Sequence, residues 1–150
     1  MNTVDQWLNE YTLSHHNAVN KRLHWICVPL IVLSVALVLK AIPLASGPFN
    51  AATIVGVLAL LYYFVLSWRL GIGMSLVFAA LYALVLAMEA ALGSWLLLAA
   101  IVIFVLAWIG QFIGHHIEGK RPSFLKDLQF LLIGPLWLLA DVYRRLSLPI

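Results

Sequence analysis

Formal charge is the scarcest feature of this 150-residue chain. Asp, Glu, Lys and Arg make up 10% of it, and between Ala41 and Ile117 only Arg69 and Glu89 are charged. Soluble domains carry roughly 25% charged residues. With 64% hydrophobic residues and a mean hydropathy of +1.02, the composition excludes an ordinary soluble domain. It predicts an all-α integral membrane protein, because helices satisfy their backbone hydrogen bonds without water.

Cysteine is nearly absent as well. Cys27 is the only one, and it lies in an apolar run. A single thiol excludes a disulfide framework within the chain.

Nine Lys and Arg against six Asp and Glu give a net charge of +3, which in a soluble chain would suggest a nucleic-acid partner. Here the basic residues flank apolar runs, so we expect membrane lipid and no nucleic acid as a partner.

Four apolar runs are each near the ~20 residues that a helix needs to cross a bilayer. We predict transmembrane helices over residues 22–41, 50–68, 73–92 and 95–114. The expected breaks between them contain Pro43, Gly47 and Pro48, then Gly71 and Gly73 in a tight turn, then Gly93 and Ser94. Residues 1–150 would form a single membrane domain.

The two ends of the chain differ from these spans. Residues 2–14 place Val4, Trp7, Leu8 and Tyr11 at helical spacing, which predicts an amphipathic helix whose apolar face meets the membrane surface. Residues 128–142 are apolar but short, and Gly134-Pro135 interrupts them. Proline breaks a straight helix, so we expect an interfacial or re-entrant pair of short helices in this segment.

The basic residues predict the orientation in the membrane. With four spans, Lys40 stands alone on one side, and the other side carries Lys21, Arg22, Arg69, Lys120, Arg121, Lys126, Arg144 and Arg145. Cytoplasmic loops carry the excess of Lys and Arg. We therefore expect both termini to be cytoplasmic, in a bacterial inner membrane or an endoplasmic-reticulum membrane. On the far side, Glu89 is expected to snorkel or to pair with Lys40.

The five histidines fall into two clusters at opposite ends of the apolar middle. His15, His16 and His24 precede it, and His115 and His116 follow it. An even number of spans brings both clusters to the same, cytoplasmic face. One histidine at a membrane edge is usually only an amphipathic residue, but five on one face predict a metal site. Neutral imidazole is the commonest protein metal ligand and suits iron, zinc and copper.

Each polar neighbour of the histidines has more than one possible role. Asn20 lies one helical turn before His24 and would hydrogen-bond a ligand or substrate, or serve capping and packing. Glu118 would be a ligand, an orienting partner of an imidazole or a solvated charge. Lys120 and Arg121 would hold a substrate carboxylate or set topology and bind lipid headgroups. Upstream, Gly110 and Gly114 form a GxxxG pair that permits close helix approach.

These residues resemble a known family over nearly the whole chain. One motif comprises Tyr11, His15, Asn17, Asn20, His24 and Pro29; a second comprises Gln111-Phe112-Ile113-Gly114-His115, Glu118, Lys120, Arg121 and Pro122; a third is Gly134-Pro135. They are similar to those of the Mpo-type family of 2-hydroxy fatty acid dioxygenases. In the family pattern the glutamate follows the histidine by four residues, whereas here Glu118 follows His115 by three.

The resemblance implies an Fe(II)-dependent enzyme of fatty acid α-oxidation. Family members use O₂ to convert a long-chain 2-hydroxy fatty acid into CO₂ and the fatty acid one carbon shorter, in yeast as part of sphingolipid degradation. The family-type ligands are His15, His24 and His115, with His16 or His116 as a further ligand. From the residues themselves, we predict Asn20 and Glu118 as catalytic residues and Lys120 and Arg121 as substrate-binding residues.

Three other functions stay open at this point. A di-iron fatty acid hydroxylase or desaturase would use about eight histidines in HxxxH and HxxHH boxes, but this chain has five and no HxxHH. A non-enzymatic membrane scaffold with a structural metal would have a coordinatively closed site. A bis-histidine haem protein is the third alternative. The dioxygenase is our prediction.

Overall fold

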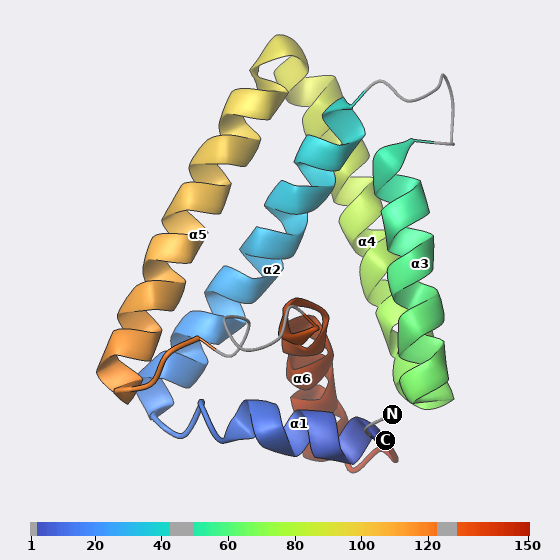
Figure 1. Cartoon of the computed structure of the whole chain (residues 1–150). Helices are drawn as coiled ribbons and strands as arrows, with labels where there is room; N and C mark the ends of the chain where they lie inside the picture. Colours follow the sequence, from blue (N-terminus) through green and yellow to red (C-terminus); the bar gives the residue numbers. More distant parts are fainter. Residues whose placement is uncertain (1–2, 43–49, 123–128) are drawn as a thin grey trace.

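In a computed structural model, the described residues are 3–42, 50–122 and 129–150, and these contain helices and no strand (Figure 1). The α-helices are α1 (Val4–Thr12), α2 (Ala18–Ala41), α3 (Ala51–Leu66), α4 (Trp68–Leu92), α5 (Leu96–Glu118) and α6 (Phe130–Arg145), and one 3-10 turn, η1 (Gly93–Trp95), joins α4 to α5. The expected turn at Pro43, Gly47 and Pro48 lies outside the described residues.

Helices α2 and α5 form the pair that carries the histidines. The side chain of Asn17 accepts a hydrogen bond from the Val19 N–H and so caps the start of α2. Small residues on α5 let the two backbones approach. A methyl group at Gly110 would lie 2.5 Å from the Cys27 Sγ, and one at Gly114 would overlap the Asn20 Oδ1. The close approach predicted from the GxxxG pair is confirmed.

Helices α3 and α4 form the second pair, and the break between them differs from the prediction. It falls at Ser67, whose extended backbone ends α3 and whose hydroxyl accepts from the Leu70 N–H. Gly71 and Gly73 lie inside α4, so the predicted tight turn is wrong. They serve packing instead, since a methyl group would lie 2.7 Å from the Phe64 ring at Gly71 and 2.6 Å from the Tyr143 hydroxyl at Gly73.

Two helical stretches of the described chain are long and apolar enough to cross a membrane. The first is Ala18–Ala41, which contains an 18-residue window with a mean hydropathy of 2.2, and the second is the continuous 51-residue stretch Trp68–Glu118, which contains one with a mean hydropathy of 2.7. The second folds back at η1, where Gly93 has a positive φ of 51°, so α4 and α5 run as separate arms (Figure 1). Ala51–Leu66 is apolar but shorter.

The C-terminal segment is one helix and not the predicted pair of short helices. Pro135 lies inside α6, where it removes one backbone hydrogen bond. Packing offsets this loss, because Ile133, Leu136 and Ala140 are fully buried. The Tyr63 hydroxyl also donates to the Leu132 carbonyl oxygen at 2.9 Å, in the turn that the proline weakens.

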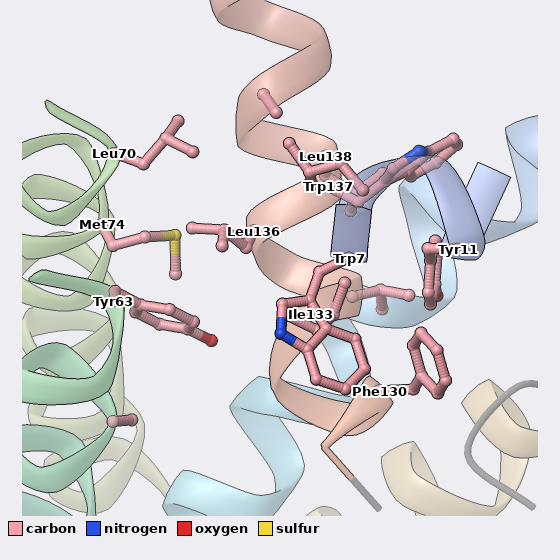
Figure 2. Close-up of a cluster of buried hydrophobic side chains, with 14 residues drawn as sticks. Trp7, Tyr11, Tyr63, Leu70, Met74, Phe130, Ile133, Leu136, Trp137 and Leu138 are labelled. Atoms are coloured by element: carbon pink, nitrogen blue, oxygen red, sulfur yellow. The ribbon is translucent and has the colours of Figure 1, made fainter. Parts of the chain in front are cut away.

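The apolar face of α1 packs on α6, which corrects the expectation that it meets the membrane surface (Figure 2). Trp7 and Phe130 make an edge-to-face contact with ring centroids 5.3 Å apart. The Trp137 indole N–H donates to the Thr12 Oγ1 at 2.9 Å. An amphipathic pattern defines an apolar face, but it does not distinguish lipid from a protein partner. Trp137 is therefore a packing residue, whereas Trp68 and Trp95 are exposed.

The charges divide between the two ends of the molecule. The Lys40 ammonium lies 3.1 Å from a Glu89 carboxylate oxygen, so the predicted pair is confirmed. Figure 1 shows that the opposite end collects α1, the start of α2, the α3–α4 junction, the end of α5 and α6. The described basic residues apart from Lys40 belong to these segments, and Lys126 lies outside the described residues. The histidines share that end.

Candidate metal centre

Three histidines from three separate segments meet at the end of the α2–α5 pair. His15 follows the last turn of α1, His24 lies in α2 one turn after Asn20, and His115 lies in the last turn of α5. The three side chains are 0%, 1% and 5% exposed, respectively. A histidine is rarely so fully enclosed, and here three are enclosed together.

His15 and His24 are oriented by backbone carbonyls. The His15 Nδ1 lies 2.6 Å from the Tyr11 carbonyl oxygen, and the His24 Nδ1 lies 2.9 Å from the Asn20 carbonyl oxygen. A carbonyl oxygen only accepts, so each Nδ1 carries the hydrogen and donates it. Each neutral ring therefore presents a bare lone pair at Nε2. This is the arrangement by which metal-binding histidines are usually fixed, with one nitrogen bound to a carbonyl and the other free for the ion.

The two Nε2 atoms face each other at 2.8 Å. With both Nδ1 atoms protonated, neither Nε2 of a neutral ring has a hydrogen to share, and two lone pairs at this distance repel. A cation relieves the repulsion: either a proton, which makes one ring an imidazolium, or a metal ion. Burial lowers the pKa of the His15 imidazole from 6.5 to about 4, so protonation of His15 is disfavoured at neutral pH. The pair therefore suits a metal ion.

His115 completes a three-histidine group. Its ring centroid lies 5.0 Å from that of His15 and 5.0 Å from that of His24. One nitrogen from each of the three rings can be chosen so that all lie within 4.8 Å of one another. Two nitrogens bound to one ion at about 2.1 Å are up to about 4.2 Å apart, so a shift of tenths of an ångström seats all three. The donor set fits a first-row transition metal.

Tyr11 supports this group in a way that its place in the motif does not reveal. Its ring stacks on His15, with centroids 4.2 Å apart and planes 12° apart, while its carbonyl holds the His15 Nδ1. A methyl group at Gly134 would lie 3.0 Å from the Tyr11 hydroxyl, so the glycine leaves room for the ring. The sequence signal was the helical spacing of Tyr11 in α1, which indicated only an apolar face.

His16 and His116 are exposed and lie outside the three-histidine group. Each is the chain neighbour of an enclosed histidine, and consecutive residues point in different directions from the backbone. The structure thus brings together three of the five histidines that the sequence offered as ligands.

Glu118 fastens the end of α5 to the turn before α2. One carboxylate oxygen accepts from the His16 N–H at 2.9 Å, and the other accepts from the Asn17 N–H at 2.8 Å and from the Asn20 Nδ2 at 3.0 Å. Asn20 also donates to the Ser14 carbonyl oxygen at 3.2 Å. Glu118 and Asn20 therefore hold, through hydrogen bonds, the backbone on either side of His15. Among these hydrogen bonds none goes to an imidazole, so the role of Glu118 in orienting an imidazole stays a prediction.

Lys120 and Arg121 lie outside the enclosed centre. The Lys120 ammonium donates to the Leu13 carbonyl oxygen at 2.6 Å, which ties the residues after α5 to the end of α1. Arg121 is exposed. The predicted role of this pair in holding a substrate carboxylate stays a prediction.

A cavity of about 50 Å³ opens beside His24 and His115. Its wall is mainly apolar, and the residues that line it are Tyr11, His24, Val28, Ile31, Val32, Trp108, Gln111, His115, Phe130, Leu131, Gly134 and Pro135. Gln111 had no assigned role in the sequence. A buried amide within an apolar span was the signal that could have found it, because polar groups at that depth are costly.

The contacts of Glu118 generate a prediction about metal affinity. Loss of the carboxylate in Glu118→Ala should weaken binding of Co(II) by about 10–100-fold, the usual effect of removing a group that orients ligands. At saturating Co(II) the visible absorption spectrum should keep its wild-type shape, because the ligand set is unchanged. The measurement is a titration against a competing chelator, with Glu10→Ala as the control that removes an exposed charge. A changed spectrum at saturation would instead identify Glu118 as a ligand.

The comparisons with known proteins agree with this geometry. A family model described as 2-hydroxy-palmitic acid dioxygenase Mpo1-like matches residues 1–146. No curated protein and no solved structure matches the chain. The matched region includes all three enclosed histidines, Glu118 and the whole of α6. The chain belongs to the Mpo1-like family, which takes its description from 2-hydroxy-palmitic acid dioxygenase.

Proposed function

We propose that this protein is a non-haem Fe(II) dioxygenase of fatty acid α-oxidation that acts on long-chain 2-hydroxy fatty acids. The observation that carries the proposal is the pair of Nε2 atoms of His15 and His24, 2.8 Å apart, with both opposite nitrogens held by carbonyl oxygens. The family supplies the reaction class, since its description names a 2-hydroxy acid dioxygenase.

His15, His24 and His115 are the residues that would hold the iron. Imidazole nitrogen suits iron, and non-haem iron oxygenases keep coordination positions open beside a small set of protein ligands. A three-histidine set is consistent with this. When bound, iron would supply the activation of O₂ next to the bond between Cα and the carboxylate of the substrate. The protein's part is to keep the imidazoles neutral, oriented by Tyr11 and Asn20, and enclosed.

The overall reaction balances with O₂ as the only oxidant. A 2-hydroxy acid R–CH(OH)–COOH and O₂ give R–COOH, CO₂ and H₂O. The bond between the carboxylate carbon and Cα breaks, Cα is oxidised to a carboxylic acid, and O₂ takes up all four electrons. No external reductant and no 2-oxoglutarate enter the balance. The site therefore needs room for two reactants, the hydroxy acid and O₂.

The cavity suits the polar head of the substrate and not its chain. One enclosed water needs roughly 10–15 Å³, so about 50 Å³ holds a carboxylate with its neighbouring hydroxyl. A long acyl chain exceeds that volume. Ile31, Val32 and Pro135 are half-buried apolar residues of the cavity wall, and the acyl chain would leave past them, between the helices and among membrane lipids.

The remaining predicted site residues take supporting roles in this proposal. Asn20 and Glu118 hold the His15 loop against α5 through the 3.0 Å hydrogen bond between them. Lys120 and Arg121 follow the site directly in sequence, and they would attract the anionic substrate or lipid headgroups at the membrane surface.

We further propose that α2, α3, α4 and α5 each cross the membrane and that both chain ends face the cytoplasm. Support comes from the hydropathy of these helices and from the gathering of basic residues at the end opposite Lys40 (Figure 1). The excess of Lys and Arg belongs on the cytoplasmic side, in a bacterial inner membrane or an endoplasmic-reticulum membrane. The three histidines would then lie near the cytoplasmic surface.

The shared site predicts that distant substitutions have the same effect. His24→Ala and His115→Ala should each abolish turnover of 2-hydroxypalmitate and each reduce bound iron to a small fraction of one per chain. The double variant should bind no less iron than the worse single variant, because both changes disrupt one site. Product analysis and iron analysis of protein purified without oxygen provide the measurements.

His116→Ala is the matched control, because this exposed neighbour of His115 should keep its iron and its activity. Circular dichroism confirms that each variant is folded. Full iron and full activity in folded His24→Ala or His115→Ala would contradict the shared site. Two irons per chain would favour a di-iron hydroxylase or desaturase, a Soret band would favour a haem protein, and tightly bound zinc without oxygen uptake would favour a scaffold.

The proposed topology predicts opposite accessibility for two positions. A reporter fused after Ile150 should be cytoplasmic, whereas a reporter inserted at Gly47 should lie on the other side of the membrane. Paired fusions of a reporter active only in the cytoplasm and one active only outside it make the measurement. Equal accessibility of the two positions would rule out an odd number of spans between them, and the four-span arrangement with it.

A further inference from the structure

Gln111 is an enclosed amide inside an otherwise apolar stretch of α5. It lies one helical turn before His115, and residues four apart share a face of a helix. Its side chain is 5% exposed. The residues that follow it, Phe112 and Ile113, are 51% exposed and point away from α2. Gln111 is therefore turned toward the three histidines and away from the surroundings of the molecule.

No hydrogen bond joins the Gln111 side chain to another residue of 3–42, 50–122 and 129–150. Its two ends can donate two hydrogen bonds and accept two. Its amide atoms are not among the fully enclosed polar atoms without a partner, so the amide is open to the cavity that Gln111 lines. A glutamine in this position thus points to a ligand that supplies the missing partners.

The cavity shows where that ligand would lie. Gln111 lines it together with His24 and His115, and most of the remaining wall is apolar or aromatic. The Gln111 amide and the imidazoles of His24 and His115 are hence polar groups in a mainly apolar wall. A carboxylate with an adjacent hydroxyl matches an amide, because the N–H donates to a carboxylate oxygen while the carbonyl accepts from the hydroxyl.

We propose that Gln111 recognises the head of the 2-hydroxy acid, donating through Nε2 to its carboxylate and accepting through Oε1 from its 2-hydroxyl. This inference rests on the proposed function and adds a specificity-determining contact to it. A site that hydrogen-bonds a substrate hydroxyl strongly rejects the analogue without it, because the polar groups of the site are then left unpaired. Gln111 thereby distinguishes a 2-hydroxy acid from the unsubstituted acids that are abundant in a membrane.

The test compares binding of two short acids that fit the cavity. Iron-loaded protein without oxygen is titrated calorimetrically with 2-hydroxyoctanoate and with octanoate. Wild-type protein should prefer 2-hydroxyoctanoate. Gln111→Met keeps the length of the side chain and removes both polar ends, so it should bind 2-hydroxyoctanoate at least tenfold more weakly and lose most of the preference. Iron per chain should remain at the wild-type level.

Two further variants sharpen the comparison. Ile113→Met is the matched control, because it introduces the same residue on the exposed side of the same helix and should leave both affinities unchanged. Gln111→Glu replaces the donating end by an acceptor that repels the substrate carboxylate, so it should also bind 2-hydroxyoctanoate at least tenfold more weakly. In turnover with 2-hydroxypalmitate, KM should rise more than kcat falls, because the contact exists in ground and transition states alike.

Wild-type affinity and preference in folded Gln111→Met or Gln111→Glu would overturn the inference. Loss of iron in Gln111→Met, to the extent expected for His115→Ala, would overturn it too, because the residue would then act by supporting the metal centre. These results leave the proposed function standing. Failure of the wild-type protein itself to bind or convert 2-hydroxy acids would instead refute the proposed function and this inference with it.

Discussion

Two nitrogen lone pairs that face each other dominate this structure. The Nε2 atoms of His15 and His24 lie 2.8 Å apart, and both opposite nitrogens donate to carbonyl oxygens, so the neutral rings have no proton to place between them. Enclosure disfavours a protonated ring. A cation between the two rings would remove the repulsion, and His115 provides a third nitrogen beside the pair. The three enclosed histidines could therefore hold a metal ion.

The rest of the fold brings these rings together from distant parts of the chain. Gly110 and Gly114 remove the side chains that would keep α5 away from α2. Glu118 then ties the end of α5 to the backbone of the loop that carries His15, across about a hundred residues. On the other side, α6 supports α1 (Figure 2), and Tyr11 of α1 stacks on His15. The helices thus give an enclosed centre with a cavity at its edge, and the wall of that cavity is mainly apolar.

The sequence predicted the all-helical fold, the approach of α2 and α5, the pairing of Lys40 with Glu89, and the histidines from which the centre is built.

The sequence-based predictions were wrong or missing where the role of a residue depends on which other part of the chain it contacts. Gly71 and Gly73 suggested a turn, but a tight neighbour also requires glycine, and the Ser67 cap ended the preceding helix. The apolar face of α1 was assigned to lipid, but α6 covers it. Gln111 received no role because α5 is apolar on every side, so its sequence does not reveal which face meets α2. His15 and His16 are likewise equivalent until the turn before α2 orients them.

Iron K-edge X-ray absorption on the Fe(II)-loaded protein, prepared without oxygen, tests the central claim most directly. The account predicts one iron per chain with a first shell of three imidazole nitrogens, the remaining positions being taken by oxygen, and a spectrum that changes when 2-hydroxyoctanoate is added. A shell containing sulfur, a second iron at short distance or a porphyrin signature would contradict a single iron held by His15, His24 and His115.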